Sequence, residues 1–306
     1  MKSVLPFLAL IAIGAAWGAT QPLAKIAVSD GYRHFGLIFW QLVIGGALLV
    51  PLCLLRGKPV VWGRAQIGLY VFVAVIGTVL PGIASYSAAI HLPSGVLSIL
   101  LSSVPMLSLP IALAMGLEGF SRRRFWGLAL GLVGVALLVL PQASLPDGVP
   151  VFWIGVALLS SIFYALEGNV IAKWGTIGLD AMQVLAGASL VGIVISAPLA
   201  IYTGQFINPL GPWQGPDYAL VAAAILHAGA YSGYVWLVGL AGSVFAAQVS
   251  YLVTLFGVTW AMIFLGEGYS GWIWAALTVM MAGVSLVMPR RRGLVQDRAV
   301  RQTTTV

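Results

Sequence analysis

Long apolar runs alternate with short polar segments along the chain. Each run is about 20 residues long, the length that a helix needs to cross the hydrocarbon core of a membrane, whereas a barrel strand needs only about ten alternating residues. The runs cover residues 4–24, 34–55, 66–88, 94–116, 124–141, 151–172, 180–202, 217–238, 242–265 and 271–289. The segments between them, such as RGKPVVWGR and EGFSRRR, hold turn-forming and charged residues. The pattern therefore predicts an all-α membrane protein with ten transmembrane helices.

Composition supports a membrane protein and excludes several other classes. Hydrophobic residues make up 60% of the chain and charged residues 8%, with a mean hydropathy of +1.02. A soluble domain carries roughly 25% charged residues, so too little charge is present to cover a water-facing domain. Cys53 is the sole cysteine, which excludes a disulfide framework and a cysteine-based metal site. We expect neither a cofactor nor a metal.

The first apolar run also resembles a secretory signal peptide. The stretch MKSVLPFLALIAIGAAWGA has a lysine, an apolar centre and small residues of the kind that a signal peptidase recognises. An internal repeat, described below, gives this segment a counterpart in the second half of the chain. We therefore interpret it as the first transmembrane helix.

The distribution of basic residues predicts the orientation in the membrane, because cytoplasmic loops carry an excess of Lys and Arg. A cytoplasmic N-terminus places thirteen of the fifteen basic residues on the cytoplasmic side and only Lys25 and Arg33 on the other. Both termini are therefore expected in the cytoplasm. The net charge of +7 is then mainly an orientation signal, and nothing indicates a nucleic-acid partner. The basic tail, residues 291–306, is expected to be disordered and to contact anionic lipid headgroups.

Matched features recur at a spacing of 148 or 149 residues, which indicates an internal repeat. Ala24-Lys25 corresponds to Ala172-Lys173, and Glu118-Gly119-Phe120-Ser121 to Glu267-Gly268-Tyr269-Ser270. Further matched pairs are Tyr86 with Tyr234, Gly134-Val135 with Gly283-Val284, and Pro141 with Pro289. Because each copy holds five helices, an odd number, the second copy must be inverted in the membrane. The predicted repeats are residues 1–146 and 147–290, and such inverted repeats recur in secondary transporters, which bind substrate between the two copies.

The five-plus-five layout, the WGATQPLAK segment at residues 17–25 and the Glu-Gly element after the fourth and ninth helices resemble the drug/metabolite transporter superfamily. The similarity is to its EamA-type exporters and, within these, to the YddG-type exporters of aromatic and other neutral amino acids. The resemblance implies a multi-pass protein of the bacterial inner (plasma) membrane that exports amino acids and related metabolites. We expect a monomer in the lipid bilayer.

Polar side chains are costly inside a membrane and are expected to face the bundle interior or a watery cavity. His227, Tyr231 and Tyr234 are spaced four and three apart, which places them on one face of a helix. This face suits a flat, apolar substrate group, although an ordinary packed helix would show the same spacing. The candidate substrate-binding residues are Trp17, Gln21, Tyr86, Ser102, Tyr164, Glu167, His227, Tyr231, Tyr234, Gln248 and Ser250.

Glu167 is an acidic residue inside the sixth apolar run, where no basic residue lies within one helical turn. Its carboxyl could bind a substrate ammonium, carry a coupled proton, or form a structural hydrogen bond near the membrane interface. His227 is likewise a candidate for proton coupling or for a structural hydrogen bond. Pro105 and Pro110 interrupt the fourth run, and we expect them to act as hinges or simply to bend the helix.

These features favour a secondary exporter that alternates the access of a central cavity between the two sides of the membrane. The chain lacks the phosphate-binding loop GxxxxGK[ST], so ATP cannot drive it directly. An exporter of lipophilic amines or drug-like compounds on the same fold is the alternative, followed by a channel. An enzyme is not expected, because His34, His91 and His227 lie on different predicted helices and form no ligand cluster.

Overall fold

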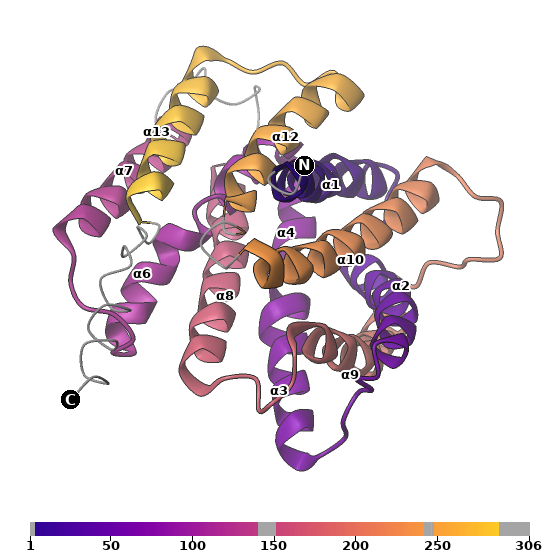
Figure 1. Ribbon diagram of the computed structural model, residues 1–306. Helices are drawn as coiled ribbons and strands as arrows, with labels where there is room; N and C mark the ends of the chain where they lie inside the picture. Colours follow the sequence, from indigo (N-terminus) through magenta and orange to yellow (C-terminus); the bar gives the residue numbers. More distant parts are fainter. Residues whose placement is uncertain (1–3, 140–150, 242–245, 247, 288–306) are drawn as a thin grey trace, which may run out of the picture.

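The computed structural model describes residues 4–139, 151–241, 246 and 248–287 (Figure 1). Throughout these ranges the regular secondary structure is helical, and no strand occurs. The first half comprises α1 (Leu5–Ser29), α2 (His34–Leu55), α3 (Arg64–Ala74), the π-helical turn η1 (Val75–Val79), α4 (Leu80–His91), α5 (Ser94–Leu101), α6 (Val104–Ala114) and α7 (Arg122–Val139). The second half comprises α8 (Phe152–Trp174), α9 (Ala181–Tyr202), α10 (Gly215–Ala241), α12 (Val249–Leu265) and α13 (Gly271–Val287).

Seven helical segments in the described ranges are long and apolar enough to cross a membrane. They are Leu5–Ser29, His34–Leu55, Arg64–His91, Ser94–Ala114, Phe152–Trp174, Ala181–Tyr202 and Gly215–Ala241. Val249–Leu265 and Gly271–Val287 are shorter apolar helices, and α7 begins with three arginines. The prediction of an all-α membrane protein is therefore confirmed. The ten spans, the inverted repeat and the cytoplasmic termini stay predictions, and Pro141, Pro289 and the tail 291–306 lie outside the described residues.

Two of the membrane-spanning segments are broken at positions that prolines explain. Pro81 cannot donate a hydrogen bond to the carbonyl of Gly77 four residues earlier, and the chain forms the π-turn η1 just before it. Pro105 lies in the first turn of α6, and the preceding break at Ser102 and Ser103 separates α5 from α6. Pro110, by contrast, lies inside α6, which continues through it. The interruption predicted for the fourth run is therefore located before Pro105.

The helices pack in pairs that join the two halves of the chain. α1 packs against α10 and α12, α2 against α9, α4 against α8, and α7 against α13, and the α7–α13 pair forms one edge of the bundle (Figure 1). Membrane helices associate through close van der Waals packing, which small residues permit. A Cβ added to Gly127 of α7 would lie 2.7 Å from the carbonyl oxygen of Gly283 in α13, so the two backbones are in contact.

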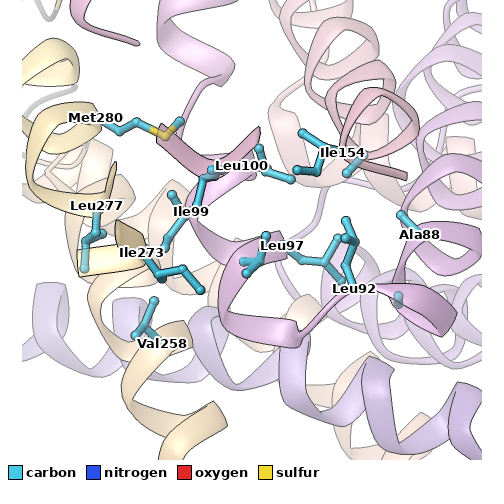
Figure 2. Close-up of a cluster of buried hydrophobic side chains, with 14 of the residues drawn as sticks. Ala88, Leu92, Leu97, Ile99, Leu100, Ile154, Val258, Ile273, Leu277 and Met280 are labelled. Carbon is cyan, nitrogen blue, oxygen red and sulfur yellow. The ribbon is translucent and has the colours of Figure 1, made fainter. Parts of the chain in front are cut away.

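A cluster of buried hydrophobic side chains surrounds the short helix α5. Figure 2 shows Leu97, Ile99 and Leu100 of α5 between side chains of α13, such as Met280, and Ile154 of α8. Residues 97–100 are therefore packed on several sides, and α5 is anchored at the centre of the bundle. This position allows α5 and the break after it to form part of the wall of a central cavity.

Two half-buried charged side chains hold the corner between α4 and α5. The Lys25 ammonium donates hydrogen bonds to the carbonyl oxygens of Ala89, Ile90 and Leu92 at 2.7, 3.2 and 3.1 Å, at the carboxyl end of α4. The Glu267 carboxylate accepts from the backbone N–H groups of Ser94 and Gly95 at 2.8 and 3.2 Å. Cations favour the C-terminus of a helix and anions its N-terminus. Both helix ends at this corner are therefore capped by charges from distant parts of the chain.

A second polar cluster fixes the start of α9. Asp180 forms a capping box with Gln183, and its carboxylate lies 3.1 Å from both Arg56 and Lys58. Burial raises the pKa of the Asp180 carboxyl. The hydrogen bond from the Gln183 backbone and the charges of Lys58 and Arg56 lower this pKa, and together they outweigh the effect of burial. The net pKa of Asp180 consequently lies below its ordinary value. The cluster joins the segment after α2 to the segment before α9.

Candidate functional site

A cavity of about 590 Å³ lies where the two halves of the chain meet, within the size range of small-molecule sites. Residues from the helices α1 to α6, from η1, and from α8, α9, α10 and α12 line it. The lining is mainly apolar, with polar groups spread over several of these elements. Its polar and aromatic members are Trp17, Thr20, Gln21, Gln41, Thr78, Ser85, Tyr86, Ser98, Ser102, Tyr164, Glu167, His227, Tyr231, Tyr234, Ser250 and Thr254.

The structure brings ten of the eleven candidate binding residues to this one cavity. They are Trp17, Gln21, Tyr86, Ser102, Tyr164, Glu167, His227, Tyr231, Tyr234 and Ser250. Gln248 is the exception, because it is exposed immediately before α12 and does not line the cavity. Pro105 lines the wall, whereas Pro110 is exposed and lies outside it. Substrate binding by the ten residues stays a prediction.

The aromatic part of the wall is built around Trp17. Its indole ring packs edge-on against Tyr231, with ring centroids 6.4 Å apart, and tilted against Tyr234 at 5.8 Å. The helical spacing of His227, Tyr231 and Tyr234 thus presents all three rings to the same partner on α1. Aromatic rings arranged in this way offer a large apolar surface with polar groups at their edges.

His227 is held in one neutral form by its contact with Trp17. The indole Nε1–H donates to His227 Nδ1 at 3.1 Å. An indole nitrogen can only donate a hydrogen bond, so Nδ1 must be the accepting, unprotonated nitrogen and the ring proton resides on Nε2. Protonating both nitrogens would break this bond, and the geometry therefore favours His227 as a hydrogen-bond donor over a role as proton carrier.

The Glu167 carboxyl packs against η1 in the cavity wall. A Cβ added to Gly77 would overlap the carboxyl group, so Glu167 packs directly against this glycine. The phenols of Tyr164 and Tyr231 lie within electrostatic range of it. No basic side chain in the described part of the chain forms an ion pair with Glu167, and the described lining contains no Lys or Arg. Glu167 is thus a carboxyl group in a cavity without a protein cation to pair with it.

Asn169, two residues after Glu167, belongs to a different contact. Its Nδ2 donates to the hydroxyl of Ser108 at 2.6 Å and to the Ser108 carbonyl at 3.2 Å, on α6. It lies on a different face of α8 from Glu167. Asn169 fastens α8 to α6 and leaves Glu167 free to line the cavity.

Sequence reasoning missed the contribution of the π-turn. Gly77 and Thr78 line the cavity from η1, where the former permits the approach of Glu167. The available signal was Pro81, which follows Gly77 by four residues and disfavours a regular helix at that point. A glycine four residues before a proline inside an apolar run is therefore worth treating as a candidate wall position.

Comparisons with known proteins place this architecture in a family. The model of the EamA-like transporter family matches residues 5–140 and again residues 151–288. The uncharacterized inner membrane transporter YedA of Escherichia coli K12 is 24% identical over 291 residues, which cover 94% of this chain and 92% of YedA. The uncharacterized protein PA1977 of Pseudomonas aeruginosa is 26% identical over 260 residues and 83% of each chain.

A solved crystal structure shares the fold, with a TM-score of 0.63 at 19% identity, over 95% of this chain and 98% of the other. The family match covers both halves of the chain and all of the residues that line the cavity. This all-helical membrane protein with a central, aromatic-walled cavity is therefore a transporter of the EamA-like family.

Proposed function

We propose that the protein is a secondary exporter of small organic metabolites, with aromatic and other neutral amino acids as its substrates. The observation that carries this proposal is the cavity itself: apolar and aromatic walls, one unpaired carboxyl group, and no Lys or Arg in the described lining. The aromatic rings around Trp17 bury a flat apolar side chain. The Glu167 carboxylate binds the substrate ammonium, which supplies the cation that the protein does not.

Alternating access between the two halves is the mechanism that we infer for it. The family model matches the two halves separately, which supports an internal repeat. The packing of the helices also supports a repeat, in which α1 corresponds to α8, α4 to α10, α2 to α9 and α7 to α13. Under this correspondence the α1–α10 contact in the structure matches the α8–α4 contact. The α2–α9 and α7–α13 contacts each join two corresponding helices. Inverted repeats with a site at their interface are a common basis for rocking one half against the other. The helix breaks at η1 and before Pro105 border the cavity and provide points where the helices can bend.

The proposed location is the bacterial inner membrane. The YedA relative carries that location in its name, and the apolar helices of this chain fit a multi-pass membrane protein. We propose that both termini face the cytoplasm, as the distribution of basic residues indicates. The monomeric state also stays part of the proposal.

Counterflow in proteoliposomes tests the transport function. Vesicles that contain the purified protein are preloaded with unlabelled phenylalanine and given trace labelled phenylalanine outside at equal pH. We expect protein-dependent, saturable accumulation of label that disappears when the internal amino acid is omitted. Glu167→Gln should abolish accumulation, whereas Glu118→Gln should retain it, because Glu118 pairs with Arg124 outside the cavity. Absence of accumulation by the folded wild-type protein would show that the amino-acid assignment is wrong.

Lipophilic amines are a second candidate class, favoured by the same unpaired carboxyl. A cavity with one acidic group and no Lys or Arg in its described lining could hold a cation that lacks a carboxylate. Labelled phenethylamine in the same vesicles tests this class. Ion conductance in the absence of any organic substrate would instead indicate a channel.

A further inference from the structure

Two side chains of the cavity wall keep an N–H group available because their other polar atom is already engaged. The Tyr86 hydroxyl donates to Gln41 Oε1 at 2.6 Å, which turns the amide so that its Nε2 is the free end. Trp17 likewise occupies His227 Nδ1, which leaves the Nε2–H of that ring. Neither Nε2 atom has a hydrogen-bond partner within the described residues, and both side chains line the cavity.

Gln41 and His227 are also neighbours on the wall. Both border a second, smaller void of about 30 Å³ beside the main cavity, together with Thr78. Gln41 comes from α2 and His227 from α10, and these two helices pack against each other. The two free N–H donors therefore lie on the same side of the site, and each is supported by a partner on another helix.

Glu167 lies on α8, a different element from the two donors, with the phenols of Tyr164 and Tyr231 in its surroundings. We propose that Gln41 and His227 form an uncharged subsite for the carboxylate of a zwitterionic amino acid whose ammonium binds Glu167. This inference rests on the proposed transport function and names how the substrate is oriented. It explains how a cavity without Lys or Arg in its described lining can accept the carboxylate of such a substrate.

Neutral N–H donors suffice for this role in a site shielded from water. Hydrogen bonds to a charged group are stronger than those between neutral groups, and each is worth about tenfold to hundredfold in affinity. Tyr86 acts as a positioning residue, because its hydroxyl holds the Gln41 oxygen away from the substrate carboxylate. Gln41 and His227, and not the aromatic wall, then distinguish an amino acid from the corresponding amine.

Binding of two ligands that differ only in the carboxylate tests the subsite. L-phenylalanine and L-phenylalaninamide share the ring and the ammonium, and the amide lacks the negative charge. Affinities are measured by competition against labelled phenylalanine and by direct calorimetry with purified protein. Wild type should bind phenylalanine at least about tenfold more tightly than the amide.

Gln41→Glu keeps the shape of the side chain but replaces the donor with a second carboxylate. It should weaken phenylalanine binding about tenfold or more and change phenylalaninamide binding by less than about threefold. Tyr86→Phe should weaken the binding of phenylalanine but not of phenylalaninamide, and by a smaller factor than Gln41→Glu does. The reason is that it frees the Gln41 amide to turn but leaves the amide in place. Gln214→Glu makes the same chemical change on an exposed loop outside the cavity and should affect neither ligand.

Equal losses for both ligands in Gln41→Glu and Tyr86→Phe would overturn the subsite and assign these residues a purely structural role. Equal wild-type affinities for phenylalanine and its amide would also overturn it, while leaving an amine exporter intact. If the folded wild type binds neither ligand, the proposed substrate class itself is wrong and the subsite is wrong with it. Retained amide binding shows that a variant is folded.

Discussion

Gly77 allows the backbone of η1 to pack closely against the Glu167 carboxyl. Any Cβ at this position would occupy the space of the carboxyl group. Gly77→Ala should therefore displace Glu167, lower the affinity for an ammonium-bearing substrate about tenfold, and cost about 1–3 kcal/mol of stability through overpacking. Competition binding and thermal unfolding in detergent measure the two effects.

The matched control is Gly68→Ala on α3, in the same membrane-spanning segment. A Cβ at Gly68 meets no atom within 4 Å. This variant should bind substrate normally and unfold at the same temperature or slightly higher, because alanine is the better helix former. Normal binding by Gly77→Ala would place the Glu167 carboxyl outside the binding site.

Glu267 connects the segment between α12 and α13 to the first turn of α5. Its carboxylate accepts two backbone N–H groups that have no partner inside the helix. Glu267→Gln removes the charge from both hydrogen bonds and should lower the free energy of unfolding by about 1–3 kcal/mol. Thermal unfolding followed by tryptophan fluorescence measures this loss.

Glu118→Gln provides the comparison, since Glu118 occupies the matching position in the predicted repeat. Its carboxylate pairs with Arg124, and 39% of its side chain is exposed. Exposed ion pairs contribute about 0–1 kcal/mol, so this variant should unfold within about 1 kcal/mol of wild type. Similar losses in the two variants would contradict a specific capping role for Glu267.

Asp180 makes the start of α9 sensitive to acid. Because its pKa is lowered in the folded protein, its charge stabilises the fold above the ordinary carboxyl pKa of about 3.9, and this contribution is lost as the pH falls through the lower folded value. Asp180→Asn keeps a side-chain cap but loses the pairing with Arg56 and Lys58.

Unfolding temperatures of wild type and Asp180→Asn measured between about pH 7 and pH 3 test this cluster. We expect the wild type to be more stable at pH 7, with a constant difference down to about pH 4 and convergence of the two proteins below it. A difference that persists at the acidic end would show that the carboxylate charge is not the cause.

At the scale of the whole molecule, an all-helical membrane protein was predictable because a membrane allows few backbone solutions. Apolar length and internal hydrogen bonding select helices, and ten of the eleven candidate residues reach one cavity because polar groups avoid lipid. The pairings were not predictable. Tyr86 and Gln41 are 45 residues apart and Trp17 and His227 are 210 apart, and local periodicity carries no information about such contacts. Gln248 was misplaced for a related reason, since polarity alone does not show which side of a helix end faces the cavity.

The predicted orientation in the membrane assigns each loop to one side, and this assignment can be tested. Contacts join segments that the basic-residue pattern assigns to the same side: Arg56 with Asp180 on the cytoplasmic side, and Tyr32 with Asp217 on the outer side. Leu210 and Phe120 are 91% and 70% exposed in loops assigned to opposite sides, with α7, α8 and α9 between them. Cysteines introduced there in a Cys53→Ala background report the side directly.

Leu210→Cys should react with a membrane-impermeant maleimide in intact cells, whereas Phe120→Cys should react only after the cells are permeabilised. The opposite result would invert the orientation and place the basic loops outside. Labelling of both positions in intact cells would require an even number of crossings between residues 120 and 210. In that case one of the three intervening helices does not span the membrane, and two inverted five-helix repeats are impossible.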